Sequence, residues 1–141
     1  MPSSETPPTA GATDDRAVRV ILVGFAVYLF AVAILALVAP RAFFEKVGPF
    51  GPKNPHYTRD GAIFEFALGV GAAVAVSRQS WRVPLLATMA LQSLLHSINH
   101  LSDIANAPPR WLGPFDFVGL AIGTVVLAWA LARARRQVAR Q

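Results

Sequence analysis

Four long apolar runs dominate the chain, at residues 20–39, 61–77, 83–101 and 113–132. Each run has about the length that an α-helix needs to cross the hydrocarbon layer of a membrane, roughly 17–25 residues. Because backbone polar groups in lipid must be hydrogen-bonded within their own segment, a helix is the conformation expected for every run. The pattern therefore predicts an all-α protein, an antiparallel bundle of four transmembrane helices joined by short connections.

The composition agrees with a membrane protein. Hydrophobic residues make up 54% of the 141 residues and charged residues only 15%, whereas a soluble domain carries about a quarter charged residues. The chain has no cysteine, which excludes disulfides, thiolate metal ligands and redox-active thiols. It also has no nucleotide-binding motif, and two histidines on one helix face cannot hold a haem between them.

The two ends of the chain differ in composition from the apolar runs. Residues 1–15 are rich in Pro, Ser, Thr and Ala, and we expect them to form a disordered cytoplasmic tail. Residues 16–135 make up the predicted membrane domain, and residues 136–141 are predicted to be a basic cytoplasmic tail.

Arginine and lysine residues set the expected orientation. Four crossings place both termini on one side, together with the connection between the second and third runs. That side carries the larger share of basic residues, Arg16, Arg19, Arg78, Arg82, Arg133, Arg135, Arg136 and Arg140 against Arg41, Lys46, Lys53, Arg59 and Arg110. The excess predicts cytoplasmic termini in a bacterial inner (plasma) membrane. It also accounts for the net charge of +5 without a nucleic-acid partner.

Polar side chains interrupt the third apolar run in a regular pattern. Gln92, His96, Asn99, His100 and Asp103 follow one another at spacings that place them on one face of a helix. Such a face is expected to point into the bundle, because exposure of these groups to lipid is unfavourable.

Acidic residues from two other runs are expected at the same depth. At a helical rise of about 1.5 Å per residue, Glu65, His96 and Asp116 reach a similar level below the outer surface. We therefore expect an outward-facing polar cavity with six candidate ligand-binding residues, Gln92, Glu65, His96, Asn99, His100 and Asp116. The candidate rim or lid residues are His56, Arg59, Asp60 and Asp103.

Three interpretations of this cluster are open at the level of sequence. The polar groups could simply hydrogen-bond between helices and hold the bundle together. They could instead form a ligand pocket or an enzyme site, with Glu65 and His96 as acid and base. Histidines four residues apart also suit a divalent metal, with His96, His100, Asp103 and Glu65 as candidate ligands.

Two further segments carry expectations about structure. The connection at residues 48–60 contains three prolines and two glycines, which predicts a rigid, non-helical segment. It is either a plain connector, the preferred interpretation, or a lid in which His56 and Arg59 cover the outer pocket. Asp60 is expected to cap the helix that follows. In the fourth run, Gly119 and Gly123 form a GxxxG pair, which suits close helix approach and would allow a homodimer.

The segments "HYTRDGAIFEFALGVG" (56–71) and "LLHSINHLSD" (94–103) together resemble small four-helix bacterial integral membrane proteins of actinobacterial type, described as DoxX-like. The resemblance covers about residues 20–132 and implies the four-helix architecture. It implies no catalytic residues, because such proteins share no agreed reaction. Some DoxX-like proteins are associated with redox complexes or stress responses, which would imply a membrane protein partner.

The preferred hypothesis is a membrane protein that binds a lipophilic small molecule, or a membrane protein partner, through the outer polar cavity. The alternative is a membrane enzyme, with or without a metal, that uses Glu65, His96, His100 and Asp116 near the extracytoplasmic surface.

Overall fold

The computed structural model describes residues 10–140, which fold into five α-helices and no strand. The helices are α1 (Ala10–Val38), α2 (Pro40–Lys46), α3 (Pro55–Ser77), α4 (Gln79–Ser102) and α5 (Leu112–Val138). The prediction of an all-α fold is confirmed.

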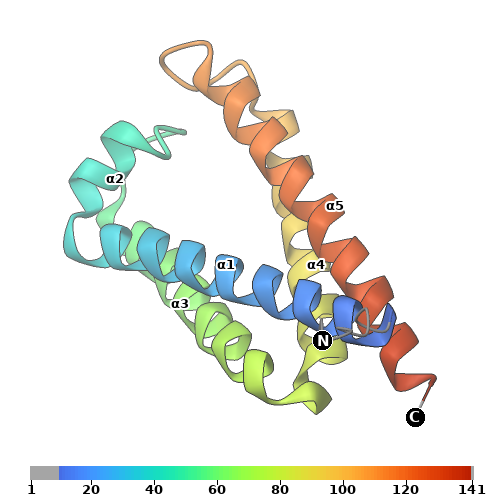
Figure 1. Cartoon of the computed structure of the whole chain (residues 1–141). Helices are drawn as coiled ribbons and strands as arrows, with labels where there is room; N and C mark the ends of the chain where they lie inside the picture. Colours follow the sequence, from blue (N-terminus) through green and yellow to red (C-terminus); the bar gives the residue numbers. More distant parts are fainter. Residues whose placement is uncertain (1–9, 141) are drawn as a thin grey trace, which may run out of the picture.

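The helices form two pairs, with α1 packed along α3 and α4 packed along α5. Figure 1 shows that the pairs meet at the end of the molecule where both termini lie and diverge toward the other end. We call these the closed end and the open end. The main apolar core lies toward the closed end, where Leu22 of α1, Leu86 of α4 and Leu127 of α5 are fully buried or nearly so.

Three of the helices, α1, α3 and α5, are long and apolar enough to cross a membrane. The sequence predicts a fourth crossing at α4. With 24 residues, α4 is long enough to cross a membrane. Among the described residues, however, α4 does not reach the same apolarity, because amide, hydroxyl and imidazole side chains interrupt it.

The connection before α3 differs from the predicted non-helical segment. Residues 55–60 are helical, and Asn54 caps α3 by accepting hydrogen bonds from the backbone nitrogens of His56 (3.0 Å) and Tyr57 (3.3 Å). The predictions of a non-helical segment up to residue 60 and of a cap at Asp60 are therefore wrong. Pro55 explains the difference, because proline at the first helical position favours a helix start. Asp60 instead lies one turn beyond His56, with 3.4 Å between Oδ2 and Nε2.

Two further boundaries differ from the sequence interpretation. Residues 10–15 belong to α1 rather than to a disordered tail, and residues 1–9 of that tail lie outside the described residues. The short helix α2 follows α1 directly, with Pro40 at its first turn. Pro40 therefore follows the end of α1 and begins a new helix.

Close packing at the open end depends on a glycine. A Cβ at Gly113 would lie 2.0 Å from the carbonyl oxygen of Ile104, so no larger residue fits without moving backbone. This contact brings the start of α5 against the chain that leaves α4 and keeps the two helices adjacent up to their connection.

Candidate functional site

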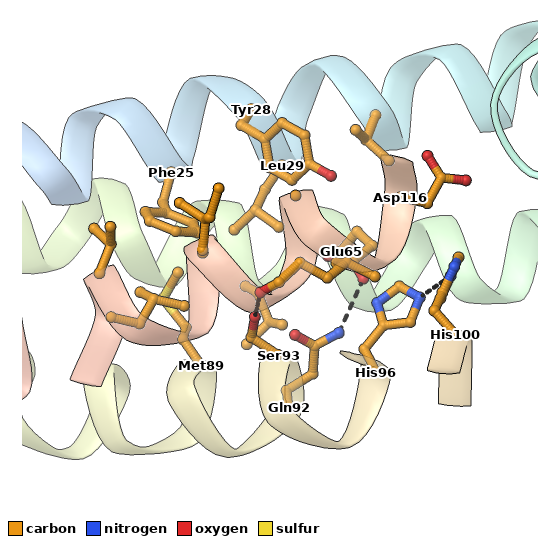
Figure 2. Close-up of a pocket in the computed structure, with 18 of the residues that line it drawn as sticks. Phe25, Tyr28, Leu29, Glu65, Met89, Gln92, Ser93, His96, His100 and Asp116 are labelled. Atoms are coloured by element: carbon orange, nitrogen blue, oxygen red, sulfur yellow. Dashed lines mark hydrogen bonds between the residues drawn. The ribbon is translucent and has the colours of Figure 1, made fainter. Parts of the chain in front are cut away.

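A cavity of about 760 Å³ lies between α1 and α5, with side chains of α3 and α4 forming its base. Its size falls within the range of roughly 300–1,000 Å³ that is typical of small-molecule sites. Figure 2 shows the lining, with Phe25, Tyr28 and Leu29 of α1 on one side and residues of α4 on the other. Most of the lining side chains are apolar.

Apart from Ser93, the polar lining residues gather at one end of the cavity, toward the open end of the molecule. They are Glu65 of α3, Gln92, His96 and His100 of α4, and Asp116 of α5. The hydroxyl of Tyr28 points toward the same end in Figure 2. An apolar chamber with polar groups at one end matches the shape of an amphiphile.

A hydrogen bond between two of these residues joins the helix pairs. Gln92 Nε2 of α4 donates to Glu65 Oε1 of α3 at 3.2 Å. The amide thus orients the carboxyl group at the base of the cavity and leaves its second oxygen without a side-chain partner among the described residues.

The two histidines of α4 contact each other. Their Nε2 atoms are 3.1 Å apart, so one ring must donate and the other must accept. This geometry excludes a pair in which both rings are protonated, because both nitrogens would then be donors. Phe50, from the segment after α2, packs edge-on against His100 with ring centroids 4.7 Å apart.

Two buried polar atoms at this end have no hydrogen-bond partner within residues 10–140. They are Oδ2 of Asp116 and Nδ1 of His100. Buried polar groups are normally hydrogen-bonded, because an unmade bond costs free energy. Both atoms belong to residues that line the cavity, so a molecule bound there can supply the partners.

Hydroxyl groups form a second polar contact, between α4 and α5. Ser93 Oγ lies 2.9 Å and Ser97 Oγ 3.3 Å from Thr124 Oγ1. Ser97 donates to the carbonyl of Ser93. Thr124 Oγ1 (2.9 Å) and Ser93 Oγ (3.5 Å) both lie within hydrogen-bond distance of the Leu120 carbonyl oxygen, so either hydroxyl can be the donor in the Ser93–Thr124 contact. We call Ser93, Ser97 and Thr124 the hydroxyl seam. The seam packs the two helices together and leaves Gln92 and His96 facing the cavity.

The cavity opens sideways between α1 and α5. The exposed lining residues on these two helices are Gly24 and Tyr28 on α1, with Phe115, Gly119 and Ile122 on α5. Tyr28 is 55%, Phe115 67% and Ile122 60% exposed. Both helices that flank this apolar mouth, α1 and α5, are long and apolar enough to span a membrane.

The structure brings together five of the six candidate ligand-binding residues. Asn99 is exposed and lies away from the main cavity, over a shallow surface depression. The four candidate rim residues do not line the cavity either. The edge at the open end is formed instead by Phe43, Val47, Gly48 and Phe50.

The geometry gives no support to the predicted metal site. Among the described residues, no group of three His, Asp or Glu side chains is placed to hold a metal ion. Asp103 accepts a hydrogen bond from Asn106 Nδ2 at 2.9 Å, and Glu65 is bound to Gln92.

Sequence reasoning missed Tyr28 and the glycines as cavity residues. Tyr28 is the one residue of the run 20–39 with a polar side-chain group, which is the signal that could have identified it. Gly119 and Gly123 both line the cavity, and a Cβ at Gly123 would contact Phe25 and Ser93. Their small size makes room between α1 and α5 within one chain.

Fold and site define the class of this protein, a helical membrane-embedded protein with an interhelical cavity. Comparison of the chain with family models, curated proteins and solved structures finds no match. The resemblance to DoxX-like proteins accordingly stays a prediction.

Proposed function

We propose that this protein is a four-helix integral membrane protein that binds a lipophilic molecule in the cavity between α1 and α5. The ligand's apolar body occupies the chamber lined by Phe25, Leu29 and Met89, and its polar end meets Glu65, His96 and Asp116. One observation carries the proposal: a single cavity joins an apolar, sideways-facing mouth to a cluster of inward-facing polar groups.

The positions of the polar side chains of α4 support the proposal of a fourth crossing. Gln92 and His96 line the cavity, and Ser93 and Ser97 are buried in the hydroxyl seam. The exposed face of α4 between residues 88 and 101 is mainly apolar, with Leu91, Leu94, Leu95, Ile98 and Leu101, although Thr88 and Asn99 also lie on it. An apolar outer face with a polar inner face is the arrangement expected in lipid. With four crossings, the excess of arginine near the termini places them in the cytoplasm and the polar end outside.

The enzyme hypothesis lacks a comparable observation. A general acid or base must lie within hydrogen-bond reach of the substrate atom with which it exchanges a proton, and no such arrangement is marked out by the described residues of the cavity. Among residues 10–140, neither His96 nor His100 hydrogen-bonds a carboxylate; the rings bond to each other, and Glu65 bonds to Gln92. Binding therefore explains the cavity with fewer assumptions.

The proposal is tested by filling the cavity from within. A Cβ at Gly119 meets no atom within 4 Å, so Gly119→Leu places its side chain in the cavity without displacing backbone. Gly61→Leu is the matched control, because Gly61 is also helical, exposed and free of contacts, but lies outside the cavity.

Organic extracts of the wild-type protein and the two variants, purified in native-lipid nanodiscs, are compared by mass spectrometry. We expect one amphiphile to be enriched with the wild type and with Gly61→Leu and to be depleted with Gly119→Leu. Identical extracts from all three proteins would contradict the proposal.

A further inference from the structure

We propose that the ligand is an amphiphile whose headgroup donates hydrogen bonds and carries no negative charge, with a long-chain amine preferred over a long-chain alcohol and a fatty acid excluded. This inference rests on the proposed function and specifies the ligand's chemistry. It follows from the charges and hydrogen-bonding capacity of the polar end of the cavity.

The cavity contains acidic groups without a basic counterpart. Glu65 and Asp116 line it, and no lysine or arginine among the described residues does so. The ion pairs of the described residues lie elsewhere, at the closed end, on the surface of α2 and at the start of α3. A carboxyl group in apolar surroundings either keeps its proton or is stabilised by a cation. A ligand ammonium group would supply the cation that the chain itself does not place there.

The histidines do not balance the two acids. Because their Nε2 atoms share one hydrogen bond at 3.1 Å, at most one of the two rings carries a positive charge. The polar end therefore holds up to two negative charges against at most one positive charge. An anionic headgroup would meet unfavourable electrostatics there, and in apolar surroundings such repulsion is weakly screened.

The unmet hydrogen bonds point to the same headgroup chemistry. Asp116 Oδ2 is a buried acceptor without a partner among the described residues, and Glu65 has one oxygen beyond the one that accepts from Gln92. An ammonium group has three donors and a hydroxyl group has one donor. Both can reach these oxygens, but the ammonium group also adds the charge-assisted component, which strengthens such bonds.

The mouth determines where such a ligand comes from. Tyr28, Phe115 and Ile122 present apolar, exposed surface between α1 and α5. A molecule dissolved in the bilayer reaches this opening chain-first or sideways without crossing the polar groups. We therefore infer lateral access from the hydrocarbon layer, with the headgroup held at the level of Asp116.

The test compares three amphiphiles of equal chain length, dodecylamine, dodecan-1-ol and dodecanoate. Each is added at the same mole fraction to the protein in neutral phosphatidylcholine nanodiscs at pH 7, and the midpoint of thermal unfolding is measured. A ligand that binds the folded protein raises that midpoint. We expect a rise of about 4 °C or more with the amine, a smaller rise with the alcohol and none with dodecanoate.

Asp116→Asn and Glu65→Gln, singly and together, should abolish the advantage of the amine over the alcohol. Glu45→Gln is the matched control, since Glu45 is exposed on α2 and pairs with Arg41 at 2.8 Å, away from the cavity. It should retain the wild-type order.

The outcomes separate this inference from the proposed function. Equal stabilisation by all three amphiphiles, or a preference for dodecanoate, would overturn the headgroup assignment while leaving a lipophilic site in place. An amine advantage that survives in the Asp116→Asn/Glu65→Gln double variant would also overturn it. If none stabilises the wild type, or if Gly119→Leu responds like the wild type, the binding function itself fails.

Discussion

Arg82 of α4 binds Asp15 of α1 at the closed end, with 2.5 Å between Nη1 and Oδ1. The same guanidinium donates from Nε to the carbonyl of Ala75 (3.1 Å) and from Nη2 to that of Val76 (3.3 Å), which satisfies carbonyls in the last turn of α3. Arg82 is only 1% exposed. One buried side chain therefore joins three helices at the point where the two helix pairs meet.

Loss of this side chain should destabilise the protein strongly. Arg82→Gln leaves Asp15 without its closest cation and removes two carbonyl contacts. Breaking a fully buried pair typically costs about 3–5 kcal/mol, and we expect a smaller loss here because the side chain of Asp15 is 34% exposed. Arg19→Gln is the control, because Arg19 binds the same Asp15 (2.8 Å) but is 53% exposed, and exposed pairs contribute below about 1 kcal/mol. Thermal unfolding in nanodiscs measures both. Equal unfolding midpoints for the two variants would refute the role of Arg82.

The hydroxyl seam should contribute modestly to stability. Thr124→Val keeps the shape of the side chain but removes the 2.9 Å hydrogen bond with Ser93 and the 3.3 Å contact with Ser97. Hydrogen bonds between membrane helices average about 0.6 kcal/mol each, so we expect a loss of about 1 kcal/mol. Thr88→Val is the control, because Thr88 is exposed and bonds only the carbonyl of Pro84 in its own helix. Equal stabilities of the two variants in a chemical denaturation series would argue against the seam.

Cysteine labelling distinguishes three crossings from four. The chain has no cysteine, so Ser80→Cys and Ala105→Cys each introduce a unique thiol at exposed positions flanking α4. If α4 crosses the membrane with cytoplasmic termini, a membrane-impermeant maleimide labels Ala105→Cys in intact spheroplasts and Ser80→Cys only after permeabilisation. Labelling of both from the same side would exclude a crossing by α4, and the reverse pattern would invert the orientation.

Hydrophobic patterning was sufficient to predict the four long helices, because the apolar runs are long and their breaks are marked by proline and charged residues. It could not predict α2, whose seven residues are too short for a periodic signal. Nor could it predict that Asp14 and Asp15 are helical. Their place in α1 is supported by Arg133 (2.6 Å from Asp14) and Arg82, which are distant in sequence.

Only part of the candidate site could be predicted, because the sequence pattern of one helix does not specify how other helices pack against it. Spacing along one helix correctly grouped Gln92, His96 and His100, since residues four apart share a face. It misplaced Asn99 in the cavity, because the direction of the partner helices decides which part of a broad polar face is covered. The mouth of the cavity depends on how α1 and α5 diverge from each other. The sequence pattern of either helix alone does not specify this arrangement.

The central claim, that a lipophile occupies the cavity between α1 and α5, is tested most directly by mapping where one binds. Dodecanol carrying a mid-chain diazirine is photolysed with the protein in nanodiscs, and the modified residues are located by mass spectrometry. We expect modification to concentrate on cavity residues such as Phe25 and Met89 in the wild type and in Gly61→Leu, and to fall to background there in Gly119→Leu. Modification confined to outward-facing residues such as Val27 and Val125, and unchanged among the three proteins, would contradict the account.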